Sequence, residues 1–355
     1  MRIIHTADLH LESSLLRLSP EQARERGAEL YTAFDRMVDE AVRLDARLFI
    51  IAGDLFDIKK VSKRAVERIC SVIERHPEID FLYLRGNHEG TAFTDKMSAQ
   101  PKNLRLFGDD WTYFEYGEIV VVGRNTLDEG MFGTLKLDPL YRNILVMHGP
   151  VRDYSGAKDG ISLPDAAAVD ADYIALGHYH SYTAYKLSDR AEAVYCGTPE
   201  GRGFDEPGEH GFVVIETDTP TVSHRFIPTA RRIIHIVKVD IDGSMGRREV
   251  EDAVADKIYS IPSSDLVRVV LTGKRAVELS LDTRAITDRW RSRFYYLEVL
   301  DETGLDIDPM SYAHDKSLKG EFIRMVYARE DLSPEMREGI VRCGIGALMG
   351  EDFDI

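Results

Sequence analysis

Basic charge, cysteine and long apolar runs are all scarce in this sequence of 355 residues. No apolar run approaches the roughly 20 residues of a membrane helix. Residues 1–8 predict a strand that ends in polar residues rather than a secretion signal. The three cysteines, Cys70, Cys196 and Cys343, lie far apart, which argues against a disulfide framework and a thiolate zinc site. We therefore expect a soluble, cytoplasmic protein that does not bind a membrane.

The formal net charge of −16 argues against a protein that coats nucleic acid through bulk positive charge. A local basic surface remains compatible with that total. Hydrophobic residues make up 44% of the chain, which is enough for one large domain with a sizeable core and for one or two smaller domains.

The apolar patterning predicts a two-sheet α/β sandwich flanked by helices over residues 1–228. Helices are expected to begin after Ser19 and Ser62, because serine is a good N-cap and Pro20 suits a first turn. The predicted strands are 2–7, 47–52, 81–84, 118–122, 144–147, 173–176, 193–195 and 212–216.

The pattern changes near residue 228. Alternating strands and helices over 229–304 predict a small α+β domain, and residues 305–355 predict two short C-terminal helices. The helices carry apolar stripes formed by Phe322, Ile323, Met325 and Val326, and by Met336, Ile340 and Cys343.

Polar side chains gather at the ends of five predicted strands. They are Asp8, His10, Asp54, Asn87, His148, His178 and His180. Ligands of open α/β sheets bind at the carboxyl ends of strands, so these side chains are expected to converge. Carboxylate, amide and imidazole without sulfur suit Mn²⁺, Fe or Zn²⁺, and the set is too large for one tetrahedral ion. We expect two divalent metal ions that share a carboxylate.

Each motif taken alone has a simpler interpretation. Asn87 fits a left-handed turn after Gly86, and His178 or His180 alone would more often be a core histidine with satisfied hydrogen bonds. It is the occurrence of all the motifs in order, each after an apolar strand, that favours a metal site.

The series DxH, GDxxD, GNH, H and GHxH over residues 8–180 resembles that of the calcineurin-like metallophosphoesterase superfamily. The rest of the chain is similar to the SbcD/YhaO-type DNA-repair exonuclease branch, the bacterial counterpart of the meiotic-recombination-eleven nuclease. The branch features are segments 5–11, 53–57, 195–202 and 206–211 and the domain after 228. The chain departs from the pattern with Glu89, where aspartate is commoner, and Cys196, where proline is usual.

The resemblance implies how the ligands are shared. One ion would be held by Asp8, His10, Asp54 and His180, and the other by Asp54, Asn87, His148 and His178, so that Asp54 bridges them.

By the same resemblance, His88 is the candidate acid that protonates the leaving oxygen. Alternatively, it only orients a neighbouring ligand. Asp57 and Glu89 would fix His88 or a ligand by hydrogen bonds, although Asp57 also fits a cap.

Basic residues occur close to these motifs. Lys59 and Lys60, with Lys63 and Arg64, follow the second motif, and Arg202 follows the predicted strand 193–195. We expect Lys59, Lys60 and Arg202 to bind substrate phosphate, since guanidinium and ammonium groups suit a polyanion. For the lysines, a solvated first turn of a helix is an equal alternative.

These features predict a two-metal-dependent, Mn²⁺-preferring DNA nuclease of double-strand-break repair, an exonuclease on DNA ends with single-strand endonuclease activity also compatible. The alternative is a phosphoesterase acting on a small phosphomonoester or a cyclic-nucleotide phosphodiester. A non-enzymatic scaffold would require a missing ligand, and none is missing. The domain at 229–304 is expected to cap the site and bind DNA.

The resemblance also implies partners. They are a second copy of the chain, as a homodimer, and an SMC-like ABC-type ATPase of the SbcC/YhaN type, docked on the helices of 305–355. The alternative for those apolar stripes is packing onto the parent domain.

Overall fold

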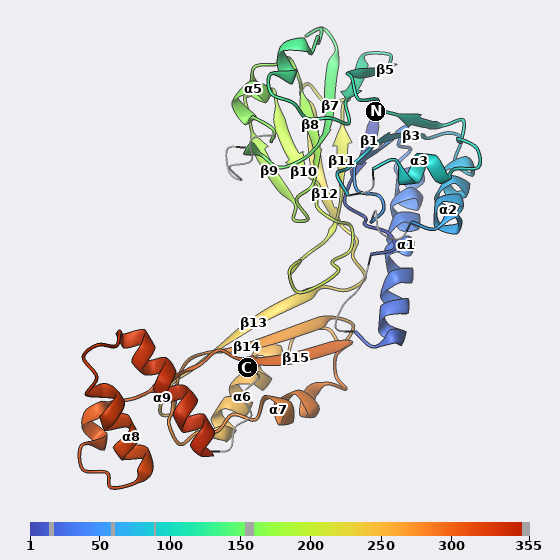
Figure 1. The fold of residues 1–355 in the computed structure, drawn as a ribbon. Helices are drawn as coiled ribbons and strands as arrows, with labels where there is room; N and C mark the ends of the chain where they lie inside the picture. The colour runs from blue at the N-terminus through green and yellow to red at the C-terminus, as the bar shows by residue number, and fades with distance from the viewer. Residues whose placement is uncertain (14–17, 58–60, 89, 153–159, 350–355) are drawn as a thin grey trace. The chain divides into compact units, whose positions relative to one another are not determined.

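The computed structural model of the chain describes residues 1–13, 18–57, 61–88, 90–152 and 160–349 (Figure 1). It contains two compact units, Met1–Ile233 and Ile234–Ile355, each with its own apolar core. The division lies close to the boundary expected after residue 228. Of the described helices, none combines the length and the apolar character needed to cross a membrane.

The first unit is built on two six-stranded sheets. One has the order β12-β11-β1-β2-β3-β4. Strands β1 to β4 are mutually parallel, and β11 runs antiparallel to both of its neighbours, β1 and β12. Its strands are β1 (Arg2–Thr6), β2 (Leu48–Ala52), β3 (Asp80–Leu84), β4 (Leu104–Leu106), β11 (Gly211–Glu216) and β12 (Ser223–Pro228). Every residue of β2 is buried, as expected for a central strand covered on both faces.

The second sheet has the order β5-β6-β7-β8-β10-β9, with a parallel centre formed by β6, β7, β8 and β10. Its strands are β5 (Thr112–Tyr116), β6 (Ile119–Gly123), β7 (Arg142–His148), β8 (Tyr173–Gly177), β9 (Thr183–Lys186) and β10 (Glu192–Tyr195). Ile50 and Val213 of the first sheet share a core with Val146 and Ala175 of the second, so the two sheets form a sandwich.

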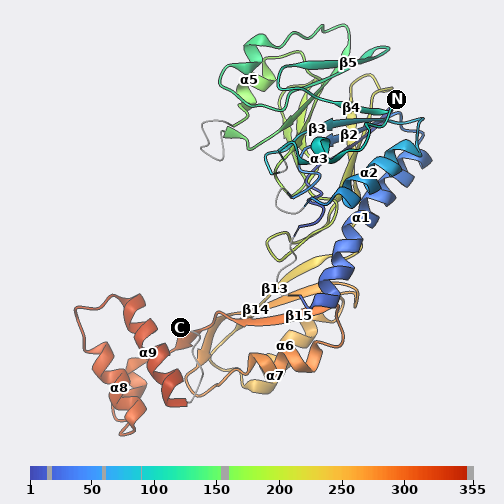
Figure 2. The same ribbon diagram turned by 45° about the vertical axis from the view of Figure 1, so that its right-hand side comes forward.

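Helices cover both outer faces. On the first sheet these are α1 (Pro20–Arg43), α2 (Lys63–Glu74) and α3 (Ala92–Lys96); on the second, η1 (Met131–Thr134) and α5 (Leu163–Ala167). Figure 2 shows α1 and α2 side by side. Ser19 caps α1 as predicted, in a capping box with Gln22. The apolar stripe of α1, which includes Phe34 and Met37, is buried. The predicted sandwich flanked by helices is therefore confirmed.

The second unit contains a parallel sheet of β13 (Ile234–Ile241), β14 (Leu266–Ala276) and β15 (Tyr296–Asp301), with β16 (Gly304–Asp306) paired to the end of β14. Helices α6 (Arg247–Ile258) and α7 (Thr283–Trp290) share its core. The chain then forms η2 (Pro309–Tyr312), α8 (Leu318–Tyr327) and α9 (Pro334–Met349). Residues of α8 and α9 pack in a second core with β16, so the C-terminal helices belong to this unit.

Candidate metal centre

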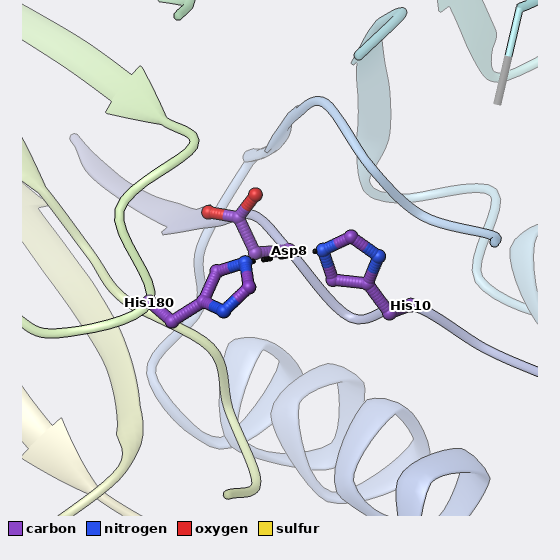
Figure 3. A group of neighbouring side chains, drawn as sticks. All are labelled: Asp8, His10 and His180. Carbon is purple, nitrogen blue, oxygen red and sulfur yellow. Dashed lines mark hydrogen bonds between the residues drawn. The ribbon is translucent and has the colours of Figure 1, made fainter. Parts of the chain in front are cut away.

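Loops at the carboxyl ends of five strands bring the predicted ligands together. Asp8 and His10 follow β1, Asp54 follows β2, Asn87 follows β3, His148 ends β7, and His178 and His180 follow β8. Ligand atoms of Asp8, His10 and His180 lie within 4.8 Å of one another, and the same holds for Asp8, Asp54 and His148. Figure 3 shows the first of these groups.

Asp8 belongs to both groups, and Asp54 of the second group also approaches His10 of the first. The Oδ2 atom of Asp54 is 3.3 Å from Nε2 of His148 and 3.7 Å from Nε2 of His10. The Nε2 atoms of His10 and His180 are 3.2 Å apart. One oxygen of the Asp54 carboxylate therefore lies close to imidazole nitrogens that come from two different strand ends.

Asn87 completes the second group. Its Oδ1 atom is 2.8 Å from Nε2 of His148 and 3.4 Å from Nδ1 of His178. The Nδ1–H of His148 donates to the carbonyl of Ala52 at 2.9 Å, which leaves Nε2 for a ligand. Short contacts thus link the seven side chains named from the sequence into one cluster, in which Asp8 and Asp54 join the two groups.

The two carboxylates of the site are buried, and in their ionised form they need positive charge beside them. Asp8 and Asp54 are 0% and 1% exposed, and burial raises the pKa of the Asp8 carboxyl to about 6. Burial opposes the charged form of Asp54 as well, but the hydrogen bond and charge of His148 outweigh it and lower that pKa to about 2. Buried carboxylates are stable only when paired with cations or metal ions.

The donors fit divalent ions. Imidazole nitrogens of His10 and His180 face each other beside the carboxylates of Asp8 and Asp54. The amide oxygen of Asn87 lies beside the imidazole of His148. Oxygen and imidazole donors without sulfur are typical of Mn²⁺, Fe and Zn²⁺ sites.

The backbone of the site is strained. Asp8, His10, Asp54 and His178 have φ angles of 53°, 45°, 51° and 119°, a region that residues other than glycine rarely adopt. Such strain collects at functional sites, where the surrounding structure holds it. Gly86 allows the close approach, because a Cβ at this position would overlap the Asp54 carboxylate.

Of the other site residues named from the sequence, His88 lies next to the cluster. His88 is exposed, donates its backbone N–H to Oδ1 of Asp54 at 3.0 Å, and has its ring centroid 5.3 Å from that of His10. Among the described residues, the carboxylate of Asp57 forms no hydrogen bond to His88; the backbone N–H of Asp57 donates to Leu11. Lys59, Lys60 and Glu89 lie outside the described residues.

Glu206 is a neighbour of the site to which the sequence assigned no role. Its Oε1 atom is 2.7 Å from Nδ1 of His180 and 2.6 Å from Nη2 of Arg202. Glu206 follows His180 by 26 residues on an irregular loop, so no local periodicity links the two. The sequence marks segments 195–202 and 206–211 as branch features and predicts a phosphate contact for Arg202, but it does not pair Glu206 with His180.

A two-sheet sandwich with such a cluster at its strand ends has its ligand site where α/β sheets usually bind ligands, and the donors are those of a metal site. Residues 1–182 match the model of the calcineurin-like phosphoesterase family, and the chain belongs to that family. The family uses a dinuclear divalent metal site, and its members are hydrolases of phosphoesters.

The chain is similar to curated proteins at low identity. It is 25% identical over 286 residues to the DNA double-strand break repair protein Mre11 of Methanosarcina acetivorans, covering 74% of this chain but only 44% of that protein. It is 24% identical over 294 residues to the uncharacterized metallophosphoesterase YhaO of Bacillus subtilis, covering 77% and 72%. Mre11 of Saccharolobus solfataricus is 21% identical over 364 residues, covering 94% and 92%.

Among solved structures, the chain resembles a dimetal phosphatase from Danio rerio with a TM-score of 0.41 and 12% identity, over 61% of this chain and 92% of that one. The chain spans less than half the length of the Methanosarcina relative.

Proposed function

We propose that this protein is a two-metal-ion phosphodiesterase that degrades DNA from its ends during double-strand-break repair. The observation that carries the proposal is the clustering of carboxylate, amide and imidazole donors around the buried carboxylates of Asp8 and Asp54. The similarity to Mre11 proteins supports DNA as the substrate.

In this proposal Asp8, His10, Asp54 and His180 hold one ion, and Asp54, Asn87, His148 and His178 hold the other. When bound, two divalent ions would supply Lewis acidity to a phosphodiester and lower the pKa of water. We propose Mn²⁺ for both positions, with Fe or Zn²⁺ as alternatives that the donor set also suits.

His88 is proposed to protonate the leaving oxygen. Its ring lies beside that of His10, and its side chain is exposed to arriving substrate. Its backbone N–H also helps to hold Asp54. The imidazole can therefore move a proton without holding an ion.

The second unit, Ile234–Ile355, is proposed to contact the DNA backbone, since it adds a folded module beyond the matched residues 1–182. For α8 and α9 we propose contact with a coiled-coil ABC-type ATPase of the SbcC/YhaN type. Ile323 and Val326 are buried, whereas Met325, Met336 and Ile340 are 65%, 54% and 38% exposed and leave apolar surface for a partner helix. A homodimer is part of the same proposal.

The test compares labelled linear DNA, bis-p-nitrophenyl phosphate and p-nitrophenyl phosphate as substrates of the purified chain under Mn²⁺, Mg²⁺ and chelator. We expect Mn²⁺-dependent cleavage of DNA and of the diester, abolished by chelator. Efficient hydrolysis of the monoester with no cleavage of DNA would instead support a small-molecule phosphatase and overturn the proposal.

A further inference from the structure

The loop between β10 and β11 holds a buried carboxylate against a ligand histidine. Glu206 is 3% exposed, and its Oε1 atom is 2.7 Å from Nδ1 of His180. We propose that Glu206, held by Arg202, is a positioning residue that fixes the ring of His180 for metal binding. This inference rests on the two-ion site proposed above.

The geometry identifies the donors. Oε1 of Glu206 accepts from Nη2 of Arg202 at 2.6 Å, and Oε2 accepts from the backbone N–H of Arg202 at 2.7 Å. An ionised carboxylate only accepts hydrogen bonds, so the 2.7 Å contact between Oε1 of Glu206 and Nδ1 of His180 requires a proton on Nδ1. Nη2 of Arg202 lies 3.1 Å from the same nitrogen and donates to the same oxygen, Oε1. His180 therefore carries its proton on Nδ1.

That proton position decides which nitrogen binds an ion. In the neutral ring, a proton on Nδ1 leaves the lone pair on Nε2, and Nε2 of His180 faces Nε2 of His10 at 3.2 Å. A ligand histidine whose other N–H is held by a carboxylate is oriented and made more basic. His148 has only a backbone carbonyl in the equivalent position, that of Ala52.

Glu206 is held independently of His180. Its backbone N–H donates to the carbonyl of Gly203 at 2.9 Å, and its own carbonyl accepts from Nε2 of His210 at 2.9 Å. Arg202 supplies the cation that a buried carboxylate requires, through a bidentate contact that lysine cannot reproduce.

The same loop is tied to α1. Arg26, which is 1% exposed, donates to the carbonyl of Gly201 and to Oε1 of Glu200, the latter at 3.0 Å. Glu200 also accepts the backbone N–H of Arg231 at 2.9 Å. The buried pair of Arg26 and Glu200 anchors the loop before Arg202, and the hydrogen bond from His210 holds it at Glu206. The Glu206 carboxylate is therefore placed before any ion binds.

This role for Arg202 differs from the phosphate contact expected from the sequence. The Arg202 side chain is only 18% exposed, and its guanidinium already contacts Glu206. The two roles predict different defects: a positioning residue changes metal affinity, whereas a phosphate contact changes only DNA binding and its salt dependence.

The experiment measures Mn²⁺ binding to the full chain by calorimetry and the spin-coupled Mn²⁺ pair by electron paramagnetic resonance. Glu206→Gln is compared with Glu209→Gln, the same substitution at an exposed position on the same loop. We expect Glu206→Gln to weaken one of the two Mn²⁺ sites about 10–100-fold, with loss of the coupled signal at Mn²⁺ concentrations that saturate wild type. Glu209→Gln should match wild type.

Two further variants keep the result interpretable. Glu206→Asp retains the charge but withdraws the carboxylate from His180, so it should also lose Mn²⁺ affinity. It tests the inference if Glu206→Gln does not fold, which is checked by cooperative unfolding of each variant in the presence of chelator. Arg202→Gln should weaken the same Mn²⁺ site. Wild-type affinity in a folded Glu206→Gln or Glu206→Asp chain overturns the inference alone, whereas a wild-type chain that binds no Mn²⁺ pair overturns the proposed function as well.

Discussion

The Asp54 carboxylate accepts the backbone N–H of His88 through Oδ1 at 3.0 Å while its Oδ2 atom faces His148 at 3.3 Å. One buried side chain thus connects the candidate ligands to the candidate acid. Removing its charge should therefore have wider consequences than removing any single histidine.

Asp54→Asn should lose both ions, because the amide keeps the size of the side chain but cannot supply the shared negative charge. Metal content after Mn²⁺ loading and desalting measures this. Asp45→Asn is the matched control: Asp45 is exposed and has the same φ of 51°, which asparagine tolerates. Two ions retained in Asp54→Asn would refute a bridging role.

His88→Ala should lower DNA cleavage by about 10²–10⁴-fold, the usual contribution of general acid catalysis, while metal content stays at the wild-type value. His178→Ala should instead lose an ion, since His178 contacts Asn87 within the second group. Both variants are assayed for Mn²⁺ content and for diester hydrolysis. If both lose the same amount of metal, His88 is itself a ligand.

Gly86→Ala should abolish metal binding, because the new Cβ would overlap the Asp54 carboxylate and its backbone nitrogen. Gly27→Ala is the control, since Gly27 lies in α1 with open space around it. There alanine should stabilise the chain by about 0.5–1 kcal/mol. Calorimetric Mn²⁺ titration and thermal unfolding distinguish the two, and wild-type Mn²⁺ affinity in Gly86→Ala would contradict the packing argument.

Lys59→Ala combined with Lys60→Ala should weaken DNA cleavage and reduce the dependence of DNA affinity on salt, because each phosphate contact releases counterions. Hydrolysis of bis-p-nitrophenyl phosphate should change little. A parallel fall in both activities would show that the two lysines support the site rather than bind DNA.

Met325→Asp combined with Met336→Asp should abolish binding of the ATPase coiled coil and leave the fold intact, because both methionines are exposed on α8 and α9. Pull-down with the purified ATPase measures the loss. Ile323→Asp is no substitute, since Ile323 is fully buried and its replacement would unfold the helix pair. Undiminished ATPase binding in the double variant would place the contact elsewhere.

The short strands at the sheet edges are a part of the fold that the sequence pattern did not predict. The central strands, such as β2 and β8, are buried along their whole length and appear in the sequence as apolar runs. Strands β5 and β9 alternate between partly buried and exposed residues, and β4 has only three residues. Such segments become strands because a neighbouring strand pairs with them, not because of their own apolar pattern.

The sequence by itself determined the sandwich core and the seven candidate ligands at its strand ends, because strand burial and the polar residue after a strand are local patterns. Tertiary structure alone decided the pairing of Glu206 with His180 and the contact of Arg202 with Glu206 rather than with solvent. It also decided the left-handed backbone at Asp8, His10 and Asp54. These features depend on contacts between loops far apart in the chain and on surroundings that hold a strained backbone, which no local pattern encodes.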